Sequence, residues 1–390
     1  MNDPSLRDVL ATNRPLIGTS RIQTKIMKRI LLNTTVGLAV MATAMITRSA
    51  MGTLSGPFAY RNLQIFLIQG DARLDEHQYA TLAEALEKGF VVIKETGNVQ
   101  ELSVENLSKA TTVFLNAGDI IKGGRQDRTV RDDLILPPQS GEVPLAAFCV
   151  EHGRWTQRGR ENPAAFSANT KSLSSKKQKM AARYGLSQSE VWSGVAEEQN
   201  RLNENVSRLA GRRVETRDAA SASSLQLTLE NKDLEAVRKA YLDRLNPILD
   251  GKNDVLGFAY AINGEINSAE VYGNKQLFRA LWPKLLDAAV TEAIAESKEG
   301  GQFQSVEPTA LKSFFETALS GSVKERQVWK TTRVKVYTTP ATVLFETLDL
   351  EAGGAWIHKS FINKGTETVV VPLDRDASQY QQQLRPPSVR

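Results

Sequence analysis

Short apolar runs separated by turn-forming residues dominate the first half of the chain. Runs of three to ten residues bounded by Gly, Pro and Asn are typical of β-strands. We predict one helix there, at residues 76–88, because Gly89 ends its pattern. The predicted strands are residues 63–68, 90–94, 102–104, 112–115, 119–121, 129–136 and 142–151.

Helical periodicity replaces the short runs in the middle of the chain. Residues 158–186 are polar, and we expect an exposed connection with a short helix at its end. Ser187 and Glu190 then have the spacing of a capping box. Apolar residues follow at a period of 3.6 as far as Gly211, which predicts a long amphipathic helix.

The C-terminal half combines a hairpin with further helices. Residues 255–262 and 265–272 flank Asn263-Gly264, and this dipeptide supplies the positive φ angles of a two-residue turn. Asn274 is expected to cap a helix in which Pro283 makes a kink or begins a second segment. The other predicted elements are strands at 225–229, 334–337, 342–347 and 356–363, and helices at 231–245 and 309–319.

The order of these elements predicts the α+β class, because strands and helices are segregated instead of alternating. We expect mostly antiparallel strands, a long-helix region in the middle and a C-terminal half of helices plus a hairpin. One domain is predicted over residues 58–370, with the option of two lobes, 58–157 and 225–370, joined by helical segment 176–211. The polar tail at 375–390 is predicted to be disordered.

The composition is that of a folded globular protein. The chain has 390 residues, of which 41% are apolar and 24% are charged. Its single cysteine, Cys149, excludes an intramolecular disulfide and is expected to be buried and unreactive. The three histidines are far apart and match no metal-binding motif. We therefore predict neither a metal nor a cofactor.

The net charge of +5 is concentrated at the N-terminus. Residues 1–44 contain six basic and two acidic side chains, and the remainder of the chain is nearly neutral. A protein that binds nucleic acid through phosphates needs a basic surface, which this remainder does not supply by net charge. The sequence therefore predicts no nucleic-acid partner.

Residues 27–44 have the pattern of a secretory signal peptide. Met27-Lys-Arg precedes an uncharged run at 30–46, and Ala-Thr-Ala at 42–44 fits a cleavage site. The polar residues 1–26 are expected to be a disordered leader or to lie upstream of the true start at Met27. The alternative is an uncleaved anchor at 30–46, which would be the only membrane contact. Both interpretations predict an exported protein, either periplasmic or extracellular, or anchored at the membrane.

A loop rich in glycine and arginine is the first candidate binding site. Two adjacent glycines let backbone amides approach a ligand, and the nearby cations suit an anion. Neither a Walker motif nor a dinucleotide motif is present. The alternative is a structural turn whose arginines pair with nearby aspartates. The predicted ligand-binding residues of the loop are Lys122, Gly123, Gly124, Arg125, Gln126 and Arg128.

The end of an apolar strand is the second candidate site. Glu151 and His152 lie where catalytic groups often project, and Asp127 in the loop is a third acid–base candidate. Arg154 and Trp155 could clamp a planar or anionic group, so they join the predicted ligand-binding residues. The alternative is a salt-bridged strand end with Trp155 in the core.

Four sequence blocks resemble the ARG and rhodanese-phosphatase-superfamily-associated protein domain family. They are GDIIKGGRQDRTV at 118–130, CVEHGRW at 149–155, SEVW at 189–192, and GFAYAING with LFRALWPKLL between 257 and 286. The resemblance extends over roughly residues 58–370. It implies no established reaction, although the neighbours in the family's name suggest phosphate or ADP-ribose chemistry.

Three functions compete on this basis. The first is a non-catalytic exported module that binds a small anionic ligand or an envelope protein partner, since no complete catalytic set is present. The second is a hydrolase for a phosphorylated or ADP-ribosyl or glycosidic substrate. It would use Arg125 and Arg128 for the anion and Glu151, Asp127 or His152 as acid or base, and it requires the two motifs to meet in space. The third is a structural role in an envelope assembly.

Overall fold

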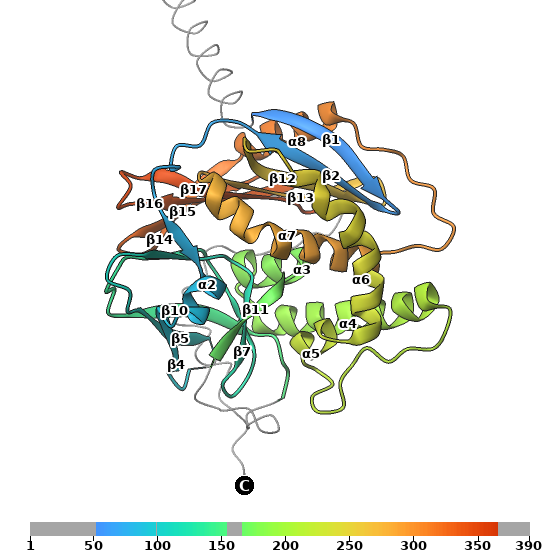
Figure 1. Cartoon of the computed structure of the whole chain (residues 1–390), viewed down its shortest axis with the longest axis horizontal. Helices are drawn as coiled ribbons and strands as arrows, with labels where there is room; N and C mark the ends of the chain where they lie inside the picture. The colour runs from blue at the N-terminus through green and yellow to red at the C-terminus, as the bar shows by residue number, and fades with distance from the viewer. Residues whose placement is uncertain (1–51, 99, 154–165, 366–390) are drawn as a thin grey trace, which may run out of the picture. The chain divides into compact units, whose positions relative to one another are not determined.

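The computed structural model describes residues 52–98, 100–153 and 166–365 (Figure 1). The described residues form one compact unit. Its class is α+β with mostly antiparallel strands, as the sequence predicts. The sequence features outside the described residues are the leader at 1–26, the signal peptide at 27–44, the tail at 375–390, Arg154 and Trp155.

The main layer is an eight-stranded antiparallel sheet (Figure 1). In spatial order its strands are β1 (Thr53–Tyr60), β2 (Leu63–Gln69), β12 (Val255–Ile262), β13 (Glu265–Tyr272), β17 (Ala355–Asn363), β16 (Thr342–Asp349), β15 (Thr332–Thr338) and β14 (Ser322–Trp329). Because β2 pairs with β12, the sheet joins strands from both ends of the described region. Every residue of β12 and of β16 is buried, which is the pattern of strands covered on both faces.

Two smaller sheets are built from the N-terminal half. The six-stranded sheet has the order β11 (Phe166–Leu173), β7 (Asp119–Gly123), β8 (Arg128–Val130), β10 (Glu142–Cys149), β5 (Glu101–Asn106) and β4 (Val91–Glu95). The three-stranded sheet has the order β3 (Tyr79–Thr81), β6 (Thr112–Leu115) and β9 (Leu134–Leu136). Only β3 and β6 pair in parallel among the described strands.

The helices lie mainly between and beside these sheets. Their bounds are α2 (Leu82–Glu87), α3 (Lys176–Lys179), the π-helical turn η1 (Met180–Tyr184), α4 (Gln188–Ala210), α5 (Leu225–Leu229), α6 (Lys232–Leu245), the 3-10 turn η2 (Asn246–Leu249), α7 (Lys275–Ala295) and α8 (Pro308–Leu319). Helix α7 packs against β12 and β11 and also contacts α4 and α6 (Figure 1). It is therefore the central helix of the largest hydrophobic core.

The start and stop signals of the long helices are confirmed. The side chain of Ser187 accepts from the backbone N–H of Glu190 at the start of α4, and Gly211 ends the helix in the left-handed conformation with φ of 67°. The side chains of Asn231 and Asn274 cap α6 and α7 in the same way. These are local interactions, so the sequence pattern alone is sufficient to place them.

The hairpin between β12 and β13 is also confirmed. Asn263 and Gly264 have φ of 54° and 80°, the left-handed values that the turn requires. Helix α7 continues through Pro283 as one segment. The second helical segment that the sequence analysis gave as an alternative to a kink at Pro283 does not form.

In the described part of residues 158–186, the short helix predicted at the end is confirmed as α3 and η1, but the predicted exposed connection is wrong. Residues 166–173 form β11, and α3 and η1 follow directly. Ser172, Ser174 and Gln178 are buried in spite of their polarity. The hydroxyl of Ser174 donates to the hydroxyl of Thr129 at 2.8 Å, so this buried hydroxyl has a partner inside the protein.

Other differences concern short elements. Residues 225–229 form helix α5 instead of a strand, because Ser224 caps its first turn and Leu225 and Leu229 share one buried face. The helix expected at 76–88 is limited to α2, with β3 before it. The strand expected at 129–136 is divided into β8 and β9. Strand β14 has no apolar pattern, since it is an edge strand with mostly exposed residues.

Candidate functional site

The glycine- and arginine-rich loop is a tight turn between β7 and β8. Gly123 and Gly124 have φ of 114° and 58°. A Cβ at Gly124 would lie 2.3 Å from the ring of Phe166 and 2.6 Å from a carboxylate oxygen of Glu95, so packing within the protein requires glycine here. The glycines thus have a structural reason that is independent of any ligand.

Most side chains of this loop face inward. Gln126 and Arg128 are fully buried, whereas Arg125 is exposed. The guanidinium of Arg128 donates to the carbonyl of Gln126 at 2.9 Å and lies 3.8 Å from a carboxylate oxygen of Glu95. Lys122 is half-buried and forms an ion pair with Glu230 at 2.8 Å. Among the loop's cations, Arg125 is therefore the one most accessible to a dissolved anion.

The two sequence motifs meet in space. The backbone N–H of Asp127 donates to the carboxylate of Glu151 at 3.2 Å, and the amide of Gln126 donates to the carbonyl of Glu151 at 3.1 Å. Both carboxylates are fully buried, and the hydroxyl of Ser224 donates to Asp127 at 3.0 Å. His152 is exposed on the neighbouring surface and packs edge-on against Trp192, with ring centroids 4.5 Å apart.

Cys149 is buried, as predicted. Its thiol donates to the carbonyl of Glu151 at 2.9 Å, and the side chain of Gln188 bonds both backbone groups of Cys149. Burial raises the pKa of the thiol, which disfavours the nucleophilic thiolate. The structure thus places Cys149 in a structural contact between β10 and α4.

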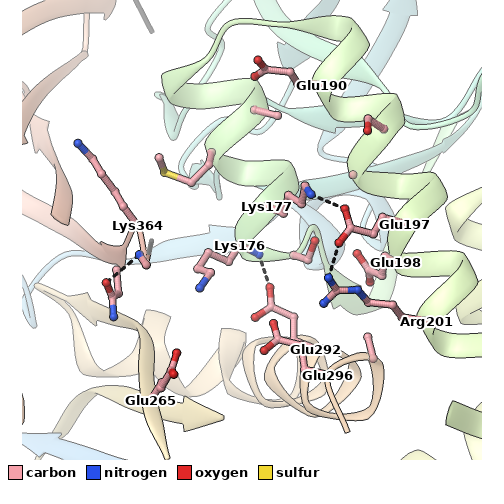
Figure 2. Close-up of a pocket in the computed structure, with 18 residues that line it drawn as sticks. Lys176, Lys177, Glu190, Glu197, Glu198, Arg201, Glu265, Glu292, Glu296 and Lys364 are labelled. Atoms are coloured by element: carbon pink, nitrogen blue, oxygen red, sulfur yellow. Dashed lines mark hydrogen bonds and ion pairs between the residues drawn. The ribbon is translucent and has the colours of Figure 1, made fainter. Parts of the chain in front are cut away.

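A cleft of about 660 Å³ lies elsewhere, between α3, η1, α4 and α7 (Figure 2). The start of β13 and the end of β17 close its remaining side. Exposed Ser193 and Arg201 belong to its lining, so the cleft reaches the protein surface. Its charged lining residues are Lys176, Lys177, Glu190, Glu197, Glu198, Arg201, Glu265, Glu292, Glu296 and Lys364.

One wall of the cleft carries a small ion-pair network. Glu197 pairs with Lys177 from α3 and with Arg201 one turn further along α4, as the dashed lines in Figure 2 show. The hydrogen bond from Lys177 and the attraction of Arg201 lower the pKa of Glu197 despite its partial burial. Glu197 is therefore ionised and neutralised by the protein itself.

The facing helices α4 and α7 place two buried carboxylates at the cleft. Glu292 accepts hydrogen bonds from the backbone N–H of Lys176 and, at 2.9 Å, from the hydroxyl of Tyr260. Glu198 accepts one from the amide of Gln178 at 2.6 Å. Burial, with repulsion from Glu292 adding to it, raises the pKa of Glu198 to about 8. Glu198 is consequently protonated at neutral pH.

A third carboxylate, Glu296, lies one helical turn beyond Glu292 on α7. Burial and the neighbouring Glu292 raise its pKa, and Lys176 and Arg201 only partly oppose that rise. Titratable groups with displaced pKa values that gather in one cleft are a physical mark of a functional site. We take this cleft as the candidate functional site.

Sequence reasoning did not find the cleft. Its carboxylates lie on α4 and α7, which were predicted as helices, and at the start of β13, but another side of the cleft is formed by α3 and η1. Those residues belong to the polar segment that was expected to be exposed. The adjacent pair Glu197-Glu198 within an amphipathic helix is the one signal that could have indicated it.

A buried charge network lies on the other side of α3 and η1. His358 bonds Asp133 at 2.9 Å through Nδ1 and Glu270 at 3.0 Å through Nε2. Lys179 pairs with Glu270 at 2.8 Å, and Arg183 pairs with Asp133 at 3.1 Å. All five side chains are largely or fully buried. The helical turn that lines the cleft is thus held to the large sheet by ion pairs.

Two absences concern only the described residues, 52–98, 100–153 and 166–365. No three or more His, Cys, Asp or Glu side chains there are grouped so that they could hold a metal ion. No helix in this part of the chain has the length and hydrophobicity needed to cross a membrane.

The fold and the site define an α+β protein with a charged cleft large enough for a small molecule. The family model of the ARG and Rhodanese-Phosphatase-superfamily-associated Protein domain matches residues 53–362. Because the match covers most of the chain, the protein belongs to this family. No curated protein and no solved structure matches the chain.

Proposed function

We propose that the protein is a non-catalytic ligand-binding module that holds a small polar organic molecule in the cleft between α3, α4 and α7. The cleft's volume of about 660 Å³ carries this proposal, since it falls within the range of small-molecule sites. Its lining of charged side chains from separate elements favours a polar occupant. Export through residues 27–44 and an envelope protein partner stay predictions beside it.

A tryptophan at the rim tests the proposal. Ser193 is exposed on α4 and lines the cleft, so Ser193→Trp should fill the entrance while changing the free energy of unfolding by less than about 0.5 kcal/mol. We expect it to abolish the rise in melting temperature that a ligand causes in the unaltered protein. The measurement is a thermal-shift screen with amines, amino acids, sugars, nucleotides and phosphates.

Ala196→Trp is the matched control. Ala196 is exposed on the same helix but does not line the cleft, so this variant should respond to ligands as the unaltered protein does. An undiminished ligand response in Ser193→Trp would place the binding site elsewhere. Loss of the response in both variants would also contradict the assignment of the cleft.

A hydrolase for a phosphorylated or ADP-ribosyl or glycosidic substrate is the second candidate. The contact between Asp127 and Glu151 favours it, because the two motifs meet as this function requires. In this case Arg125→Ala should weaken binding of inorganic phosphate, and Asp127→Asn should reduce turnover of aryl phosphates or aryl glycosides by at least about 100-fold. Absence of turnover in the unaltered protein would remove this candidate.

A further inference from the structure

Three arginines converge on one buried carboxylate where β8, η1 and β14 meet. Arg131, directly after β8, donates through Nε to a carboxylate oxygen of Asp132 at 2.8 Å, and Arg326 on β14 bonds the other oxygen. Nε of Arg183, on η1, lies 3.5 Å from the same carboxylate. In the part of the chain that the structure describes, Asp132 is the one carboxylate that pairs with Arg131 or Arg326.

The positive charge of this cluster exceeds its negative charge. Arg183 has a second partner, the carboxylate of Asp133, but His358 bonds that carboxylate as well. Three guanidinium groups therefore share two carboxylates, one of which is also bonded to an imidazole. A single arginine is enough to neutralise Asp132, and like charges placed side by side repel one another. The surplus of arginines at this point requires a physical explanation.

Unsatisfied donors in the cluster supply an independent observation. Nε of Arg326 is buried and has no hydrogen-bond partner, and the same is true of Nε of Arg183. Burial lowers the pKa of Arg326, and repulsion from Arg131 and Arg183 adds to this effect, although the attraction of Asp132 opposes it. Buried donors without a partner are rare, and here they belong to cations. What the cluster lacks is a group with several acceptors and a negative charge.

Two of the arginines extend to the protein surface. The side chains of Arg131 and Arg326 are 29% and 27% exposed, whereas Arg183 and Asp132 are almost completely buried. Arg326 lies on β14, an edge strand of the large sheet (Figure 1). Trp329 of the same strand packs against the core that the N-terminal strands enclose, so the cluster lies at the junction of the sheets. A dissolved anion can approach the cluster along its two exposed side chains.

We propose that Arg131 and Arg326 bind a phosphate group, with the more deeply buried Arg183 adding positive charge. None of these arginines lines the cleft, so the inference goes beyond the proposed function. A phosphate monoester has three strongly accepting oxygens and a charge of about −1.5 to −2 at pH 7, which compensates the surplus of positive charge. The planar guanidinium group matches phosphate oxygens with paired N–H donors. A neutral ligand would leave the surplus in place.

Titration calorimetry of the whole protein in a low-salt buffer at pH 7 tests the proposal. The probes are glycerol 3-phosphate, inorganic phosphate and, as the neutral analogue, glycerol. We expect a dissociation constant below about 1 mM for glycerol 3-phosphate and no binding of glycerol. Binding of inorganic phosphate as well would mean that the phosphate group is sufficient, and binding of the ester alone would identify a phosphorylated organic ligand. Affinity for the ester should rise from pH 5 to pH 7, because its second pKa is about 6 and the arginines stay charged.

Arg131→Gln should weaken binding of glycerol 3-phosphate about tenfold or more, which corresponds to the loss of one charge-assisted contact. Arg326→Gln should do the same, but Arg131 follows a strand instead of lying within one, so its replacement carries less folding risk. Arg333→Gln is the matched control. Arg333 is 43% exposed on β15 and adjoins Val334, the residue paired with Arg326, so it faces the opposite side of the sheet. This variant should bind the ester unchanged.

The outcomes distinguish this site from the two sites discussed above. Phosphate binding that Arg131→Gln weakens and Ser193→Trp retains belongs to the arginine cluster and does not bear on the cleft. Binding that Arg125→Ala abolishes and Arg131→Gln retains would move the anion to the glycine- and arginine-rich loop and overturn the inference. Absence of phosphate binding in the unaltered protein would also overturn it, and the three arginines would then only hold β14 to η1.

Discussion

Replacing His358 with alanine is expected to lower the free energy of unfolding by about 3–5 kcal/mol at pH 6, the largest loss that we predict for one substitution. Removing one partner of a buried charge network is costly even where other partners remain, as Arg183 and Lys179 do here. Here the carboxylates of Asp133 and Glu270 would both lose the imidazolium that bridges them. The ring of Tyr272, which stacks on His358, would also face a cavity.

The pH dependence of this loss follows from the direction of the pKa shifts. Burial opposes a charge on His358, but the attraction of Asp133 and the hydrogen bonds to both carboxylates outweigh it and raise the pKa. The stability that the protonated ring provides is complete below its unfolded value of about 6.5 and is lost as the pH rises through the folded value. The difference between the two proteins should therefore shrink above neutral pH.

At acid pH, stability changes with pH in the opposite direction. Burial opposes ionisation of Asp133 and Glu270, yet His358, Arg183 and Lys179 outweigh it, which lowers the pKa of Asp133 strongly and that of Glu270 to about 2. Their contribution is present above the unfolded values near 4 and is lost as the pH falls toward 2. His358→Ala should show a weaker acid transition, because its carboxylates are protonated at higher pH.

Urea denaturation between pH 3 and pH 9 provides the measurement. His358→Gln removes the charge but keeps a polar side chain, so it should lose less stability than alanine and lack the same alkaline limb. His77 is exposed, and His77→Ala is the matched control with an expected change below about 0.5 kcal/mol. Equal stability of His358→Ala and the unaltered protein at pH 6 would show that the network does not stabilise the fold.

Glu198→Gln is expected to stabilise the empty protein by about 5 kcal/mol at pH 8 to 9, the second large effect. Burial holds the pKa of Glu198 at about 8, whereas the unfolded value is near 4.3. Between these values the unfolded state binds fewer protons, so the stability of the unaltered protein falls as the pH rises. Glutamine cannot ionise and removes this loss while keeping an acceptor for Gln178.

The check is the difference in the free energy of unfolding between the two proteins from pH 4 to pH 9. It should be near zero at pH 4, grow through neutral pH and become constant above pH 8. Glu204→Gln, on the same helix but exposed, should show no such growth. A flat difference would mean that Glu198 ionises normally in the folded state. A gain in stability is what we expect at a proposed binding site, since binding sites are often held at the expense of stability.

Local sequence patterns were sufficient for the elements whose signals are contained in a few neighbouring residues. The caps at Ser187, Asn231 and Asn274 and the turn at Asn263-Gly264 each depend on interactions within four residues. The α+β order and the burial of Cys149 were also predicted from the sequence, although Gln188, which bonds the backbone of Cys149, lies far along the chain on α4. Errors arose where long-range contacts decide, as in β11, which pairs with β7, and in Ser174 just after it, whose hydroxyl bonds that of Thr129.

The sequence by itself determined the class of fold, the long helices, the hairpin and the resemblance to the family that the chain belongs to. Only the tertiary structure decided that Asp127 and Glu151 meet in the interior, and that Glu198 and Glu292 face one cleft. Helix caps and turns are set by bonds between near neighbours in the chain. A cleft depends on which faces of distant helices pack together, and on burial that changes the charge of the side chains there.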